Sequence, residues 1–168
     1  MHELFVDRMS VLTIPPGLAV FLSAMLPVVE GRYAMVVGWR LQAPFAEALV
    51  LAVSGNLAAV VPAFLALGPL SRWGRRWSLI ARALDWVFRH ARRRKEWVDR
   101  YGVIGLTVLM GAPIPFVGGA WTGLVVAFVV GMRFWPTAVA MLLGVLISVL
   151  IVGIPTYFGA AAWNAVTN

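Results

Sequence analysis

The chain contains no cysteine and few charged residues. Of its 168 residues, 12% are Asp, Glu, Lys or Arg, whereas 61% have apolar side chains. A soluble domain carries about 25% charged residues, so a soluble fold of this size would lack the polar groups to cover its surface. The absence of cysteine excludes disulfides, thiolate metal sites and dithiol redox motifs. The composition therefore predicts an integral membrane protein.

The motifs of common enzyme classes are also missing. The sequence has no phosphate-binding loop ending in Gly-Lys-Ser/Thr, no Gly-x-Ser-x-Gly nucleophile elbow and no paired-histidine metal motif. Its two histidines, His2 and His90, are far apart in the sequence. We therefore expect no enzyme activity, no cofactor and no metal site. The missing phosphate-binding loop also excludes ATP-driven transport by this chain alone.

Basic residues are concentrated in one segment, 72–100. It holds ten of the fourteen Lys and Arg residues and three acidic residues, which gives it a net charge of +7. Short basic loops stay on the cytoplasmic side of a membrane, so we expect this segment in the cytoplasm. Apolar residues recur every three or four positions from Trp73 to Ala91, which is typical of an amphipathic helix bound to anionic lipid head groups. The competing partner of an Arg-rich run is nucleic acid, which we do not expect here.

Four apolar stretches surround the basic segment. Two of them, 43–71 and 134–160, are long enough to cross a bilayer as single helices. The other two, 10–40 and 102–131, would each reach about 45 Å as a straight helix, against a hydrocarbon core of about 30 Å. Pro and Gly interrupt both, and irregular backbone at membrane depth is tolerated only where it packs in protein or lines a cavity. We therefore predict a re-entrant helical hairpin in each. The alternative is a straight crossing by each stretch, which would give a four-helix protein with the same outside termini.

The order of these segments indicates an internal repeat. A shift of 86 residues places Pro27 on Pro113, and a shift of 92 places Asn56 on Ser148. Because a single crossing separates the halves, the second half must be inverted relative to the first. We predict an all-α polytopic membrane protein that forms one membrane domain over 1–168, with both termini outside and a site near the midplane. We also expect a homodimer, which would bury the broken helices of so small a bundle.

Two opposite charges, Glu30 and Arg32, lie inside the first broken stretch. Each charge near the centre of a bilayer costs about 2.5–3.5 kcal/mol on insertion scales, and such residues normally face a cavity or one another. In an unwound turn at Gly31, both side chains can point into one pocket. Glu30 would then exchange a proton beside Arg32, which would hold an anionic group. Burial favours the neutral acid and the guanidinium favours the carboxylate. The alternative is an ion pair with a purely structural role.

The second broken stretch offers hydrogen-bond donors for the same substrate. Its candidates are the backbone amides of Gly118 and Gly119, the indole of Trp121 and the hydroxyl of Thr122. The N–H groups and the dipole at a helix N-terminus attract anions. The other interpretation is that these small residues let helices approach closely. We predict a substrate-binding role for all four residues.

Two polar residues lie inside the predicted spans. Asn56 is about twelve residues into its span, which is close to mid-depth at 1.5 Å per residue. An amide at that depth either binds substrate or hydrogen-bonds to another helix, and we include it among the substrate-binding candidates. We interpret Ser148, in the second span, as a contact between helices.

Several runs of the sequence resemble one protein family. They are LPVVEGR at 26–32, SGN at 54–56, YGVIGL at 101–106, PIP at 113–115 and AWTG at 120–123. Together they resemble the small multidrug export proteins, which are prokaryotic membrane proteins that look like distant relatives of the DedA/VTT superfamily. The resemblance implies two facing re-entrant hairpins in an inverted repeat and a location in the prokaryotic inner membrane. DedA relatives are implicated in moving polyprenyl-phosphate or phospholipid head groups, which implies a lipid flippase. They typically carry Arg in the second hairpin, where this chain has Trp121 and Thr122.

Three functions agree with these features. The first, which we favour, is proton-coupled translocation of a small amphipathic substrate with an anionic, lipid-phosphate-like group, in which Glu30 carries the proton and Arg32 holds the anion. The second is export of organic cations, in which Glu30 binds a proton and a cation in turn. The third is a membrane scaffold that does not transport and uses its basic helix to recruit lipid or partners.

Overall fold

The fold is all-helical, as the sequence predicts. The computed structural model describes residues 14–74, 76, 81–82, 85–86, 88–89, 95–112 and 119–159. In these ranges it contains six α-helices, a short π-helix and no strand. The helices are α2 (Pro16–Met25), α3 (Glu30–Arg40), α4 (Phe45–Gly74), α6 (Lys95–Gly111), α7 (Ala120–Val130) and α8 (Phe134–Ile154), followed by the π-helix η1 (Pro155–Gly159).

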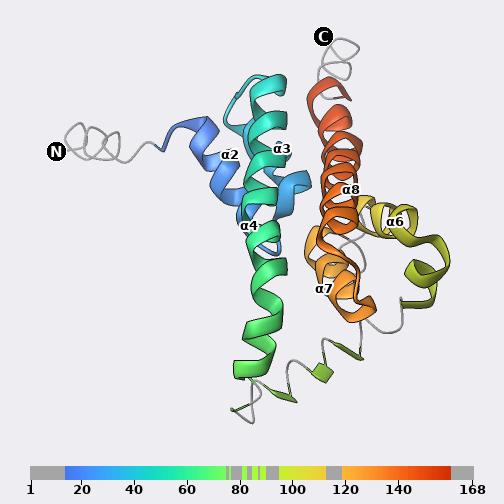
Figure 1. Ribbon diagram of the computed structural model, residues 1–168. Helices are drawn as coiled ribbons and strands as arrows, with labels where there is room; N and C mark the ends of the chain where they lie inside the picture. Colours follow the sequence, from blue (N-terminus) through green and yellow to red (C-terminus); the bar gives the residue numbers. More distant parts are fainter. Residues whose placement is uncertain are drawn as a thin grey trace.

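Two helices are long and apolar enough to cross a membrane. They are Phe45–Ser71 in α4 and Phe134–Gly159, which joins α8 to η1. At 1.5 Å per residue, each exceeds a hydrocarbon core of about 30 Å. They coincide closely with the stretches 43–71 and 134–160 that the sequence marks as spans. The two helices contact each other and run in opposite directions (Figure 1).

The other helices are about half as long and form two packed pairs. We call α2 with α3 the first helix pair, and α6 with α7 the second helix pair. The helices α2, α3 and α7 contain 10, 11 and 11 residues, so each is about 16 Å long. The first helix pair packs against α4, and α6 of the second pair packs mainly against α8 (Figure 1). The first helix of each pair therefore lies beside one long helix, whereas α3 and α7 each contact both long helices.

Proline and glycine determine where the short helices begin and end. Leu26 has φ −73° and ψ 135°, the extended conformation that the following Pro27 favours in the residue before it. This extended residue ends α2, and the chain re-enters a helix at Glu30. In α6, the backbone leaves the helical conformation at Gly102, where φ is 55°, a value that glycine adopts without strain. An apolar helix from Val103 to Gly111 therefore follows a separate basic turn.

Close contacts at two glycines hold the short helices onto the long ones. Gly55 of α4 lies against the backbone of Phe21 in α2, and Gly144 of α8 lies against Thr107 and Met110 in α6. A Cβ at either glycine would collide with these atoms. Residues without a side chain therefore let each pair of backbones approach closely, as is common between helices in membranes.

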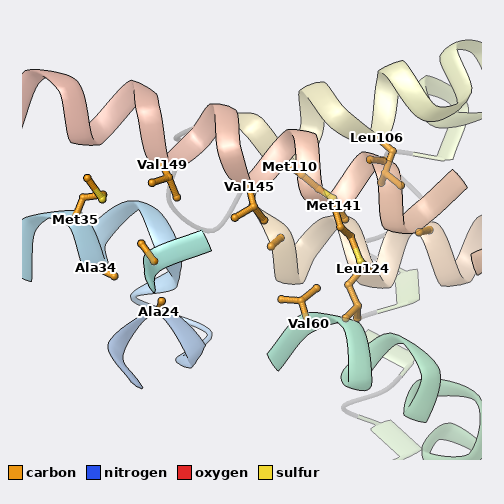
Figure 2. Close-up of a cluster of buried hydrophobic side chains, with 14 of the residues drawn as sticks. Ala24, Ala34, Met35, Val60, Leu106, Met110, Leu124, Met141, Val145 and Val149 are labelled. Atoms are coloured by element: carbon orange, nitrogen blue, oxygen red, sulfur yellow. The ribbon is translucent and has the colours of Figure 1, made fainter. Parts of the chain in front are cut away.

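Buried apolar side chains fill the space between the long helices and the short ones. Val145 and Val149 of α8 are buried together with Met110 of α6 and Val60 of α4. Figure 2 shows Val145 and Val149 on the side of α8 that faces Ala34 and Val60. The core is therefore shared by all the helices and is not confined to one pair.

Large apolar side chains also cover the outside of the described helices. The exposed fraction reaches 64% at Val50, 72% at Ile104 and 76% at Trp135. Soluble monomers rarely expose apolar patches larger than a few hundred Å², whereas helices in a bilayer present apolar side chains to lipid. This surface is that of a protein that faces lipid.

Part of the predicted basic amphipathic helix, 72–100, lies outside the described residues, namely 75, 77–80, 83–84, 87 and 90–94. At its two ends, α4 continues to Gly74 and α6 begins at Lys95, and the described residues 81–82, 85–86 and 88–89 between them are helical. The ends of the first hairpin and of the last span, at 10–13 and at 160, lie outside the described residues as well.

A methyl group at the glycine contacts should destabilise the protein. In Gly144→Ala the new Cβ would lie 2.6 Å from Met110 Cβ and 3.0 Å from the Thr107 carbonyl oxygen, and overpacking of this kind costs about 1–3 kcal/mol. We expect a lower unfolding temperature in detergent micelles. Gly68→Ala is the control, because the nearest atom to its new Cβ is Phe128 Cε2 at 3.8 Å. Equal unfolding temperatures for the two variants would contradict the close packing.

Candidate functional site

Glu30 begins α3 with an unusual backbone conformation. Its φ is 52°, a left-handed value that few residues other than glycine adopt. The Glu30 N–H donates a hydrogen bond to the Leu26 carbonyl oxygen over 2.9 Å, which closes the turn around Pro27. A backbone outlier of this kind costs about 1–3 kcal/mol and is found most often at functional sites. The turn therefore holds the Glu30 carboxyl group in a fixed place at the start of α3.

Glu30 and Arg32 form a buried ion pair. Their exposed fractions are 5% and 3%, and Arg32 Nη2 lies 3.2 Å from Glu30 Oε2. The left-handed conformation is at Glu30, and Gly31, where the sequence predicts an unwound turn, is part of α3. This backbone turn brings together two side chains that would point to different faces of a regular helix. The guanidinium carbon also lies 5.3 Å from the centre of the Tyr33 ring, within the range of a cation–π contact. Removing one partner of a buried pair leaves the other charge uncompensated, which costs about 3–5 kcal/mol.

Arg32 also connects the first helix pair to the second. Its Nη1 donates a hydrogen bond to the carbonyl oxygen of Ala112 over 3.0 Å, across 80 positions of the sequence. Ala112 directly follows the last residue of α6. The C-terminal end of a helix carries unpaired carbonyl oxygens and a partial negative charge. The cation therefore lies at the helix end that favours it.

The Glu30 carboxylate lies at the opposite kind of helix end. The backbone N–H groups of Ala120 and Trp121, in the first turn of α7, donate hydrogen bonds to it. Gly119 precedes α7 with φ 110°, and a Cβ at this position would lie 2.5 Å from Glu30 Oε2. Only glycine allows the carboxylate to come this close. Because N–H groups and a partial positive charge occur at a helix N-terminus, the anion is also placed where it is favoured.

A small cavity lies beside the ion pair. The volume that the centre of a water molecule can occupy in this cavity is about 10 Å³. This is close to the smallest cavity that holds one water. Within the described part of the chain, three buried atoms at this cavity have no hydrogen-bond partner: Arg32 Nε, Asn56 Oδ1 and Ser148 Oγ. The lining residues are Glu30, Gly31, Arg32, Asn56, Met110, Ala120, Val145, Ser148 and Val149.

The predicted site residues of the first half of the chain meet at this cavity. Glu30, Arg32 and Asn56 all line it, although Asn56 belongs to a different helix. Their contacts agree with a shared site, and their roles in transport stay predictions. Asn56 is 1% exposed, and its Oδ1 has no partner among the described residues.

Only some of the predicted site residues in the second half of the chain lie at the ion pair. Gly119 lies against the Glu30 carboxylate, and Trp121 donates its backbone N–H to that group. The Trp121 indole Nε1 is buried and has no hydrogen-bond partner in the described ranges. Thr122 is not among the residues that line the cavity, and Gly118 lies outside the described residues.

The structure also adds residues that are not among the predicted site residues. Ala112 and Ala120 act through backbone groups, which every residue type possesses, so no side-chain pattern marks them. Ser148 lines the cavity, whereas its hydroxyl was interpreted as a contact between helices. The sequence does contain one signal for a role of Ser148 at the site, namely the shift of 92 residues that places Asn56 on Ser148.

An all-helical fold with two long apolar helices and an apolar outer surface defines the chain as a helical membrane protein. Its buried ion pair lies where two pairs of broken helices meet. Residues 30–151 match the model of the family described as "Putative small multi-drug export protein", and the chain belongs to this family. The match begins at the site residue Glu30 and ends within α8. No curated protein and no solved structure shows a significant match. The family description supports membrane transport as the class of function.

Gly119→Ala should separate Glu30 from α7. The new Cβ would occupy the place of the carboxylate oxygens, so the protein should lose hydrogen bonds to a charged group, each worth about 1.5–3 kcal/mol. We expect a lower unfolding temperature than in the control Gly131→Ala. That control also places a side chain at positive φ, 78°, but meets no atom within 4 Å. When both substitutions are made in a Glu30→Ala background, the difference in unfolding temperature between Gly119→Ala and Gly131→Ala should become smaller. An unchanged difference would show that the contact with Glu30 is not its cause.

Proposed function

We propose that the protein is a proton-coupled membrane transporter for a small amphipathic substrate with an anionic group, such as a lipid-phosphate head group. One observation carries the proposal: the buried Glu30 carboxylate contacts the Arg32 guanidinium and the N–H groups at the start of α7, which are the groups that such an anion would need. Charges in this setting normally face a substrate or ion pathway. The family description agrees with transport.

The mechanism that we propose is a competition between the Glu30 carboxylate and the substrate anion. The Arg32 guanidinium and the N–H groups at the start of α7 hold the carboxylate. Protonation of Glu30 removes its negative charge and so weakens these charge-assisted contacts together. Arg32 and the α7 N-terminus then become available to an anion. When Glu30 loses its proton, the carboxylate displaces the substrate, so proton and anion move in the same direction.

We further propose that each helix pair is a re-entrant hairpin and that the two halves form an inverted repeat. Within each pair, the short helices pack side by side and are too short to cross a bilayer. The shift of 86 residues that aligns the two prolines also places Phe21 on Thr107 and Ala24 on Met110. These are the residues of α2 and α6 that lie against the glycines of α4 and α8. Inverted repeats of this kind carry substrate sites at their interface, near the midplane.

The same proposal includes the setting of the protein. It places the chain in the inner membrane of a prokaryotic cell, with segment 72–100 on anionic lipid in the cytoplasm, both termini outside and a homodimer as the working form. Kinship with the DedA/VTT superfamily belongs to this proposal, and it would fit a substrate with a lipid phosphate. An 18-residue window within Phe134–Gly159 has a mean hydropathy of 2.7, which supports a membrane span beside the site.

Glu30→Gln should abolish proton-driven transport and leave the fold intact. The amide keeps the size of the side chain but cannot exchange a proton. We would reconstitute the protein in vesicles, impose a pH gradient and follow the movement of a fluorescent short-chain phosphatidylglycerol. Glu47→Gln, at an exposed acidic residue in the first turn of α4, is the matched control and should transport normally. Undiminished transport by Glu30→Gln would remove the proton role.

Export of organic cations is the second candidate, and the family description favours it. Arg32→Ala separates the two functions, because an anion needs the guanidinium whereas a cation is repelled by it. We expect Arg32→Ala to lose anionic lipid that co-purifies with the wild type, measured by native mass spectrometry. Arg133→Ala, at an exposed arginine before α8, is the control. Tighter binding of tetraphenylphosphonium by Arg32→Ala would favour the cation exporter.

The hairpin topology can be tested by cysteine labelling, because the chain has no native cysteine. We expect Ile14→Cys and Leu41→Cys, which flank the first helix pair at exposed positions, to react with a membrane-impermeant maleimide from the same side of intact cells. A continuous crossing would place them on opposite sides. Labelling from opposite sides would therefore replace the hairpin by a full span.

A further inference from the structure

Asn56 of α4 and Ser148 of α8 form a second polar pair at the cavity beside Glu30 and Arg32. Both residues line the cavity, and their exposed fractions are 1% and 5%. Among the described residues, neither Asn56 Oδ1 nor Ser148 Oγ has a hydrogen-bond partner. A buried polar atom without a partner costs about as much as a lost hydrogen bond. Two such atoms at one cavity therefore indicate a group that binds between them.

The Ser148 hydroxyl differs from six other Ser and Thr hydroxyls in the described helices. Ser and Thr hydroxyls in apolar helices commonly bond to a carbonyl three or four residues earlier. Ser54 donates to the Leu51 carbonyl oxygen in this way, over 3.3 Å. The hydroxyls of Ser23, Ser71, Thr107, Thr137 and Thr156 do the same. Because Ser148 does not, its hydroxyl keeps its hydrogen-bonding capacity for the cavity.

The free atoms at the cavity match one hydroxyl group. Asn56 Oδ1 is an acceptor, Arg32 Nε–H is a donor, and the Ser148 hydroxyl can donate or accept. A hydroxyl group donates its hydrogen to Asn56 Oδ1, and its oxygen accepts from Arg32 and Ser148. A bare anion could not donate to Asn56, and an ammonium ion could not accept from Arg32. The volume of about 10 Å³ also suits a group of this size.

We propose that Asn56, Ser148 and Arg32 Nε form a site for one hydroxyl group, supplied by water before substrate binds and by the substrate during transport. The second half of this statement rests on the proposed function. Arg32 then binds two neighbouring groups of one substrate, the anion and a hydroxyl beside it. A ligand group that reproduces the hydrogen bonds of an ordered water replaces it without loss, whereas an apolar group loses affinity. The transporter should therefore favour hydroxylated anions.

A double-mutant cycle tests whether the two side chains share one group. We would measure unfolding temperatures of Asn56→Leu, Ser148→Ala and the double variant in detergent without added substrate. Each single variant should unfold at a lower temperature, and the double variant should lose less than the two losses together. Asn56→Ala replaces Asn56→Leu if the latter does not fold. In the control, the losses in unfolding temperature caused by Ser54→Ala and Ser148→Ala should add, because the Ser54 hydroxyl bonds to its own helix. Additive losses for Asn56 and Ser148 would overturn the site.

Transport of two matched lipids distinguishes the two sources of the hydroxyl. Phosphatidylglycerol and phosphatidylpropanol carry the same charge and differ in the hydroxyls of the head group. We expect the wild type to move fluorescent phosphatidylglycerol at least about 10-fold faster, since a site built for a hydroxyl rejects the analogue that lacks it. Ser148→Ala and Asn56→Leu should bring the ratio towards one, whereas Ser54→Ala should leave it unchanged.

The outcomes separate this inference from the proposed function. Equal rates for both lipids in the wild type, with transport that still needs Glu30, would limit the site to water and overturn its role in substrate selection. Transport of neither lipid, or transport that does not need Glu30, would overturn the proposed function. In that case the double-mutant cycle still decides whether the hydroxyl site exists.

Discussion

The removal of two opposite charges from water is the constraint on which the rest of the structure depends. Neither the Glu30 carboxylate nor the Arg32 guanidinium can be satisfied by solvent, and each is only partly neutralised by the other. The second helix pair supplies what is missing, because α6 ends and α7 begins at the same place. A continuous helix would have its backbone groups paired there and could offer neither carbonyl nor N–H. The breaks in the helices and the buried charges therefore require each other.

This dependence connects the local chemistry to the whole molecule. Among the described residues, the polar contacts between the two helix pairs involve one carboxyl group and one guanidinium, held in place by a strained residue and a close-packed glycine. A change in the charge of Glu30 would alter several contacts between the helix pairs together. In the proposed mechanism this is how a single proton acts on elements that are far apart in the sequence. The cavity at the same junction leaves room for about one water-sized group beside the charges that respond.

The sequence reveals the parts of this arrangement that depend on composition and on unusual residue types. The long apolar stretches predict α4 and α8, and Pro27 predicts the end of α2, because these effects are local. Glu30 and Arg32 stand out since charges are rare in apolar segments. The backbone partners of these charges, at Ala112 and Ala120, use groups that every residue type has, so their pairing with Glu30 and Arg32 follows only from the packing of distant helices.

Ser148 illustrates the same limit for a side chain. A hydroxyl in an apolar helix commonly bonds to its own backbone, so the sequence favours a structural role for Ser148 and not a role in binding. The position of its free oxygen beside Asn56 depends on how α8 lies against α4. Thr122 is the opposite case, because its neighbours in sequence are part of the site whereas Thr122 does not line the cavity.

The half-length helices have a consequence for the bilayer itself. A helix of 10 or 11 residues covers about half of the hydrocarbon thickness, and lipid adjusts its thickness to a short apolar segment by thinning. In a re-entrant arrangement, the membrane beside each pair would be indented from one side, and the two indentations would face each other across the site. A polar head group would then travel a distance much shorter than the full membrane, and the energy barrier to its passage would be set by the protein's shape as much as by its charges.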